Sequence, residues 1–170
     1  MRAQTRDTLI DGLWAGVIGY GVVVVIVALL NVLSGRSPFY TAALFGSALF
    51  YHLRDPAALV VAPGPVLAYN MVHMVVFLGL GLLCAWLVSL AERFPTTQYL
   101  FLVLLLFVAF HVYFAMAFLA RPLLGELVWW HVGIASLAAA VGMGWYLLAA
   151  HPFLRRELRE IPMGGTPPEL

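Results

Sequence analysis

The sequence predicts an all-α integral membrane protein, a bundle of four transmembrane helices with a short interfacial or re-entrant helix between the first and the second. The 170 residues are 64% hydrophobic and 10% charged, whereas a soluble domain carries about 25% charged residues. Four apolar stretches are long enough to cross a hydrocarbon core of about 30 Å, which takes about 20 residues. Proline, glycine and charged residues separate the stretches, as helix ends and lipid boundaries require.

The four predicted spans lie, in order, at about residues 9–33, 65–90, 98–120 and 127–150. The first apolar run is too long for the h-region of a signal peptide, so we expect it to be retained as a helix. This run also carries Gly12, Gly16 and Gly19. The G-x-x-x-G spacing of the first two favours close packing against another helix.

Residues 37–53, between the first two spans, are apolar but number only about 17, which is short for a span. They therefore predict the interfacial or re-entrant helix, in which Gly46 permits close packing. Residues 1–154 are predicted to form a single four-helix membrane domain. Residues 155–170 are polar and rich in proline and glycine, and form a tail that starts as a short helical extension.

The arginines predict the orientation of the bundle. Four spans place both termini on one side of the membrane, together with the loop between the second and third spans. That side collects most of the arginines: Arg2, Arg6, Arg93, Arg155, Arg156 and Arg159. Because positive loops stay in the cytoplasm, we predict a multi-pass protein of the cell inner (plasma) membrane with both termini cytoplasmic and residues 37–53 outside.

Several function classes are disfavoured. The net charge is only +1, so no nucleic-acid partner is expected. Cys84 is the only cysteine, which excludes an intramolecular disulfide and a thiolate-clustered metal site. The chain has no Walker loop, G-x-G-x-x-G, H-E-x-x-H or hydrolase elbow. The sequence therefore favours a protein without an independent catalytic activity.

Three histidines are predicted at similar depth on the outer side. His73 lies eight residues into the second span, and His111 lies ten residues before Arg121 at the end of the third. His131 lies five residues after Glu126, near the start of the fourth. At 1.5 Å per residue the depths are about 12, 15 and 8 Å. Ionisable side chains inside a membrane usually face the bundle interior or a cavity and mark functional sites.

The neighbours of these histidines fit a buried site. Asn70 and His73 are three residues apart and so share a helix face, which continues through Phe77, Gly81 and Cys84. On the fourth span, small residues follow His131 at helical spacing: Ala135, Ala138 and Gly142. Small residues allow a partner helix or a planar cofactor to come close.

The first hypothesis is a haem b, held by two of His73, His111 and His131 on facing helices, with Asn70 as a further cofactor-binding residue. The third histidine would then bond a propionate or line a quinone pocket. The protein would serve electron transfer, with quinone as a candidate partner. A chlorophyll-type pigment or a quinone alone explains the aromatic density equally well.

The second hypothesis is copper or another transition metal. Met71 and Met74 flank His73, and thioether with imidazole suits Cu(I), although Met71 is off the His73 face on a regular helix. A zinc or iron site would instead use histidines with a carboxylate, and the candidate ligands are His73, His111, His131, Glu126 and His52.

The alternative is that the histidines only bond neighbouring helices, at about 1 kcal/mol or less each. The protein would then be a non-catalytic accessory or assembly subunit of a larger membrane complex, with a homo-oligomer as another option. A small channel or transporter ranks last, because little polarity is predicted at the inner side beyond Ser89.

Overall fold

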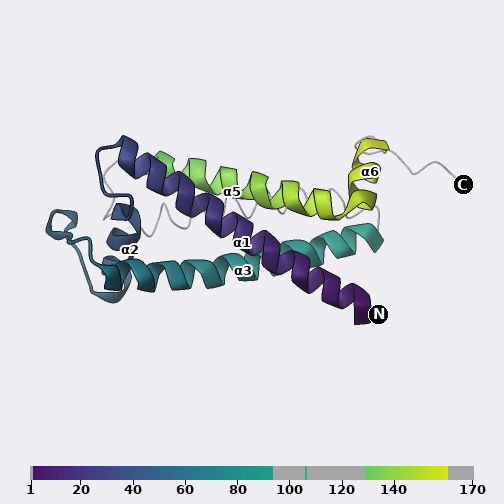
Figure 1. The fold of residues 1–170 in the computed structure, drawn as a ribbon, viewed down its shortest axis with the longest axis horizontal. Helices are drawn as coiled ribbons and strands as arrows, with labels where there is room; N and C mark the ends of the chain where they lie inside the picture. The colour runs from purple at the N-terminus through teal and green to yellow at the C-terminus, as the bar shows by residue number, and fades with distance from the viewer. Residues whose placement is uncertain (1, 94–105, 107–128, 161–170) are drawn as a thin grey trace, which may run out of the picture.

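The computed structural model describes residues 2–93, 106 and 129–160, and these residues contain helices and no strand (Figure 1). The predicted third span, at about residues 98–120, lies outside the described residues apart from Leu106. The described elements are α1 (Arg2–Leu33), α2 (Tyr40–Phe50), the 3₁₀ turn η1 (Pro56–Ala58), α3 (Pro63–Arg93), α5 (Trp129–Ala150) and α6 (Pro152–Glu160).

Three of these helices are long and apolar enough to cross a membrane. The candidate spans are Asp7–Leu33 of α1, Pro63–Glu92 of α3 and Trp130–Ala150 of α5. Only 17% of the most apolar window of α1 is buried within the protein, and large apolar side chains such as Leu13, Val17 and Val25 are exposed. Soluble proteins rarely expose so much apolar surface to water, whereas helices that cross a membrane expose it to lipid. The chain is therefore a membrane protein.

The helix α1 runs diagonally across the other two spans (Figure 1). It crosses α3 and packs along α5, whereas α3 and α5 scarcely touch each other (Figure 1). The start of α1, the end of α3 and α6 lie at one end of the bundle, which we call the N-terminal end. The helix α2 lies at the opposite end, the α2 end, together with the start of α3 and the start of α5.

Glycines allow α1 and α3 to meet backbone against backbone, as the G-x-x-x-G pattern predicts. A Cβ atom on Gly16 would lie 2.6 Å from the carbonyl oxygen of Phe77, and one on Gly12 would lie 2.7 Å from Cα of Leu82. From the other side, a Cβ on Gly81 would meet the backbone of both glycines. Only a residue without a side chain fits at these three positions.

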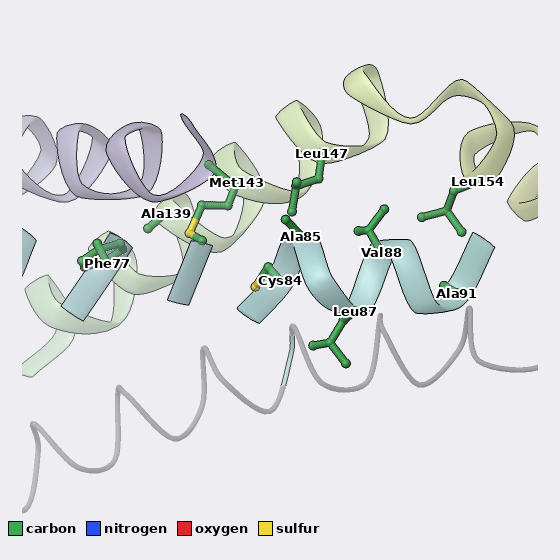
Figure 2. Close-up of a cluster of buried hydrophobic side chains, with 11 residues drawn as sticks. Phe77, Cys84, Ala85, Leu87, Val88, Ala91, Ala139, Met143, Leu147 and Leu154 are labelled. Carbon is green, nitrogen blue, oxygen red and sulfur yellow. The ribbon is translucent and has the colours of Figure 1, made fainter. Parts of the chain in front are cut away.

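The packed core lies toward the N-terminal end, where α3 comes closest to α5 and α6 (Figure 2). Ala85 and Val88 of α3 and Leu147 of α5 are fully buried there. The helix is interrupted at His151, and Pro152 is the first residue of α6. Proline suits the first position of a helix because the backbone N–H that it lacks would have no partner there. Figure 2 shows the side chain of Leu154 from α6 on the same side of α3 as the side chain of Leu147.

The helix α2 is fixed to the end of α1 and to α3. The side chain of Asn31, which is 1% exposed, donates from Nδ2 to the carbonyl of Pro38 at 3.1 Å. The hydroxyl of Thr41 donates to Oδ1 of Asn31 at 2.9 Å. Gly46 lies directly against the backbone of Pro65 at the start of α3. These contacts hold α2 against the bundle and close one wall of the site described next.

Candidate functional site

A cavity of about 360 Å³ lies among α1, α2, α3 and α5 toward the α2 end. We call it the His73 cavity. It forms where α3 and α5 lie apart, away from their contact in the core. Its walls are mostly apolar and include Val24, Val27, Phe45, Phe77 and Ala135. A mostly apolar hollow of about 300–1,000 Å³ with a few polar groups is the usual form of a small-molecule site.

The imidazole of His73 is held in the wall of this cavity by aromatic neighbours. Its ring stacks on Tyr69 at a centroid distance of 5.1 Å and is tilted against Phe77 at 5.0 Å. Its Nε2 atom is buried and has no hydrogen-bond partner among the described residues. An unpaired buried polar atom costs about 1–3 kcal/mol. A ligand that bonds Nε2 would recover this cost.

Asn70 lies in the same wall, one helical turn before His73, as their three-residue spacing predicts. Its Oδ1 accepts a hydrogen bond of 3.0 Å from the hydroxyl of Tyr20 on α1. Its Nδ2 donates to the carbonyl of Val66 at 2.8 Å. Because both ends of the amide are held, Asn70 links α1 to α3 and orients the Tyr20 hydroxyl at the cavity.

Tyr20 was not among the site residues predicted from the sequence. A signal was present, since Tyr20 lies in the middle of the first span, far from the membrane interface where tyrosine is usually found. A buried tyrosine hydroxyl normally needs a partner. A search of the neighbouring span for an amide would have found Asn70.

His131 lies on α5, one turn before Ala135, which lines the His73 cavity. The His131 side chain is 3% exposed, and its Nε2 has no hydrogen-bond partner among the described residues. Its ring meets the edge of Trp130 at a centroid distance of 4.3 Å. His131 is not itself a lining residue, but its neighbour Val132 is. The structure therefore places one histidine, His73, in the cavity wall and a second, His131, beside a lining residue of α5.

The remaining predicted ligands are dispersed or lie elsewhere in the chain. His52 is exposed and follows α2 in a left-handed conformation with φ of 56°. His111 and Glu126 lie outside the described residues. Met71 and Met74 are 68% and 41% exposed and do not line the cavity. Within residues 2–93, 106 and 129–160, no three histidine, cysteine or acidic side chains are placed to hold a metal ion.

A second group of polar side chains gathers at the N-terminal end. Nδ1 of His151 lies 2.9 Å from Oε1 of Glu92, and its Nε2 lies 3.4 Å from Oδ2 of Asp11. The hydroxyl of Tyr146 donates to Oδ1 of Asp11 at 3.3 Å. We call these four residues the His151 cluster.

From the sequence, little polarity was predicted at this end beyond Ser89. The missed signal is positional. Asp11, Glu92 and His151 lie at the ends of three different predicted spans. In the structure, the start of α1 and the ends of α3 and α5 lie at the same end of the bundle (Figure 1). Each residue alone resembles an ordinary charged helix terminus.

Comparison of the chain with protein-family models, with curated proteins and with solved structures found no match.

Proposed function

We propose that the chain is a membrane-embedded cofactor-binding protein of an electron-transfer system, which holds a haem b in the His73 cavity. The observation that carries the proposal is the buried, unpaired Nε2 of His73 in the wall of an apolar cavity of about 360 Å³. A neutral imidazole nitrogen is a common axial ligand of haem iron. When bound, the haem would supply the electron-carrying iron, and the chain would supply the ligand and an apolar enclosure.

Haem is favoured over a bare copper, zinc or iron ion by the number of protein ligands that each requires. A bare zinc ion takes three or four protein ligands, and the described residues bring no such set together. A haem provides four nitrogen ligands from its own ring and needs only one or two from the protein. His73 is the first of these, and His131 or His111 is the candidate second ligand or propionate partner.

The stacked aromatic rings around His73 also suit this role. Tyr69 and Phe77 fix the plane of the imidazole from two sides, so the ring loses little freedom when it binds. The Tyr20 hydroxyl, held by Asn70, is the polar group that would orient an oxygen-bearing part of the ligand. A quinone is the candidate electron partner, and a larger membrane complex or a homo-oligomer is the candidate assembly.

We further propose the complete four-span bundle, with α2 as an interfacial helix. The helix α3 ends at the N-terminal end, whereas α5 begins at the α2 end, and a fourth span at about residues 98–120 would connect them. The 11 residues of α2 cover about 16 Å, too short to cross a core of about 30 Å. The distribution of arginines supports a plasma-membrane protein with both termini cytoplasmic.

The experiment is an optical spectrum with metal analysis of the detergent-purified protein and of single histidine variants. We expect a Soret band in the wild type that is lost in His73→Ala. The matched control is His52→Ala, which removes an exposed histidine outside the cavity and should keep the band. Loss of the band in His131→Ala or in His111→Ala would name the second ligand.

A second pair of variants tests the cavity rather than the ligand atom. Ser136 of α5 lines the His73 cavity, so Ser136→Leu should fill space and lower haem content. Ala149→Leu adds the same bulk at an exposed position of the same helix and should have no effect. A folded wild type without colour or bound metal would overturn the cofactor proposal. The accessory or assembly subunit would then be the better interpretation.

A further inference from the structure

The His151 cluster joins three helices at the N-terminal end. Asp11 belongs to α1, Glu92 to α3, and His151 to the break between α5 and α6. The three side chains are only 22%, 23% and 13% exposed, respectively. The cluster is separate from the His73 cavity and has no part in the function proposed above.

Each of the two carboxylates accepts a hydrogen bond, so each needs an N–H donor from the same imidazole ring. A neutral imidazole carries one N–H, and its other nitrogen is a lone-pair acceptor. The contact of Nδ1 with Glu92 is the shorter, at 2.9 Å, so a neutral ring donates there. Its Nε2 lone pair then faces Asp11 at 3.4 Å. This agrees with an Nε2 atom that is buried and has no hydrogen-bond partner among the described residues.

An imidazolium resolves this conflict, because both of its ring nitrogens carry a hydrogen. It can donate to Glu92 and to Asp11 at once. Both bonds are then charge-assisted, and such bonds are roughly twice as strong as neutral ones. Asp11 keeps the hydroxyl of Tyr146 on its other oxygen in either state, so only the link between α1 and His151 changes.

We propose that the His151 cluster is a proton-operated clamp on the N-terminal end of the bundle. A proton taken from water by Nε2 of His151 adds the bond to Asp11 and so ties α1 to His151 and, through His151, to Glu92 of α3. Release of the proton removes that bond and loosens α1. Histidine is the side chain that ordinarily changes its charge between about pH 5 and 8, so the clamp is tested at pH 6 and at pH 8.

The surroundings of His151 supply the required access and charge. A cavity of about 450 Å³ borders the cluster, and its lining includes Asp7 and Ser89 together with Asp11, Glu92 and His151. The described ionisable groups beside the ring are Asp7 and Asp11 from α1, Glu92 from α3 and Tyr146 from α5. From α6, Arg155 donates its backbone N–H to the carbonyl of His151 at 3.2 Å, and its side chain is exposed.

The first test is the unfolding temperature of the full chain in detergent between pH 6 and pH 8. We expect the wild-type midpoint to fall by about 2–4 °C over this range, the size that a single charge-assisted bond gives in a chain of this length. His151→Gln and Asp11→Asn should lose most of this fall. His52→Asn removes an exposed histidine and should retain it. An equal fall in wild type and His151→Gln would overturn the proposal, as would a wild type with no fall.

The main comparison of the second test is made between two pH values on a chain whose cluster is intact, so it does not depend on cluster variants that fold poorly. Spin labels are placed at Leu13→Cys on α1 and Ala149→Cys on α5, both exposed positions. The free, buried Cys84 is replaced by serine. We expect a narrower distance distribution at pH 6 than at pH 8, and no such difference after His151→Gln. Identical distributions at the two pH values would contradict the clamp whatever the haem content of the protein.

Discussion

Replacing Gly16 by alanine tests how closely α1 and α3 pack. A Cβ at this position would lie 2.6 Å from the carbonyl oxygen of Phe77 and 2.8 Å from Cα of Leu78. Both are backbone atoms inside a helix, so they cannot turn aside as a flexible side chain could. From 2.6 Å to the 3.4 Å of ordinary contact the two helices must separate by about 0.8 Å.

A separation of this size affects the whole interface and not one residue. A gap of about 0.5–1 Å forfeits roughly a quarter to a half of the dispersion attraction between facing atoms. Helices in lipid depend on this attraction, because no hydrophobic driving force brings them together. Over-packing of well-packed interiors costs about 1–3 kcal/mol. We expect Gly16→Ala to lower the free energy of unfolding by that amount.

The matched control is Gly21→Ala on the same helix, because a Cβ there meets nothing within 4 Å. It measures the intrinsic gain of alanine over glycine in a helix, up to about 1 kcal/mol. On α3, Gly81→Ala and Gly79→Ala form the same pair, since only a Cβ on Gly81 meets α1. The difference within each pair isolates the clash.

The assay is unfolding of the purified protein in mixed micelles, followed by helicity and by the reactivity of Cys84. This single thiol is 2% exposed, so it reacts with a fluorescent maleimide only after unfolding. If Gly16→Ala and Gly21→Ala unfold at the same denaturant concentration, α1 and α3 are not packed backbone against backbone. The double variant Gly16→Ala with Gly81→Ala should cost less than the sum of the two, because the first separation makes room for the second side chain.

Three further predictions use the same unfolding assay. Asn31→Ala should destabilise the chain by about 1–3 kcal/mol, since it leaves the buried hydroxyl of Thr41 without its acceptor, and a change below about 0.5 kcal/mol would show that water replaces the amide. Leu147→Ala, at a fully buried position, should lower the free energy of unfolding by about 2 kcal/mol. Leu137→Ala, at a position 59% exposed, should change it very little, and equal losses would contradict the burial of Leu147 in the core. Tyr20→Phe should cost about 1 kcal/mol through its lost bond to the neighbouring amide, and no cost would mean that the bond contributes nothing.

Much of the helical framework follows from the sequence alone. The ranges of about 9–33, 65–90 and 127–150 correspond to α1, α3 and α5, although α1 begins earlier, at Arg2, and α3 runs on to Arg93. Apolar length sets the expected spans because lipid offers the backbone no partners, so a crossing segment must be a helix. The helix α1 includes the polar residues at the start of the chain because a helix can extend beyond the hydrocarbon core of the membrane. The predicted span at about 98–120 lies outside the described residues.

Local spacing also predicted which residues share one face of a helix. Asn70 and His73 share a wall because a helix returns to the same face after three or four residues. For the same reason His131 lies one turn from Ala135 on α5. These statements concern one helix at a time, and the 3.6-residue period determines them.

Relations between helices were decided only by the tertiary structure. Hydropathy does not distinguish the inward face of α1 or α3, because lipid is as apolar as the core and both helices are apolar on nearly every side. Small residues fix the rotation and crossing of the helices instead. That crossing puts His73 but not His131 in the cavity wall, brings Tyr20 to Asn70, and gathers Asp11, Glu92 and His151 from three distant parts of the chain.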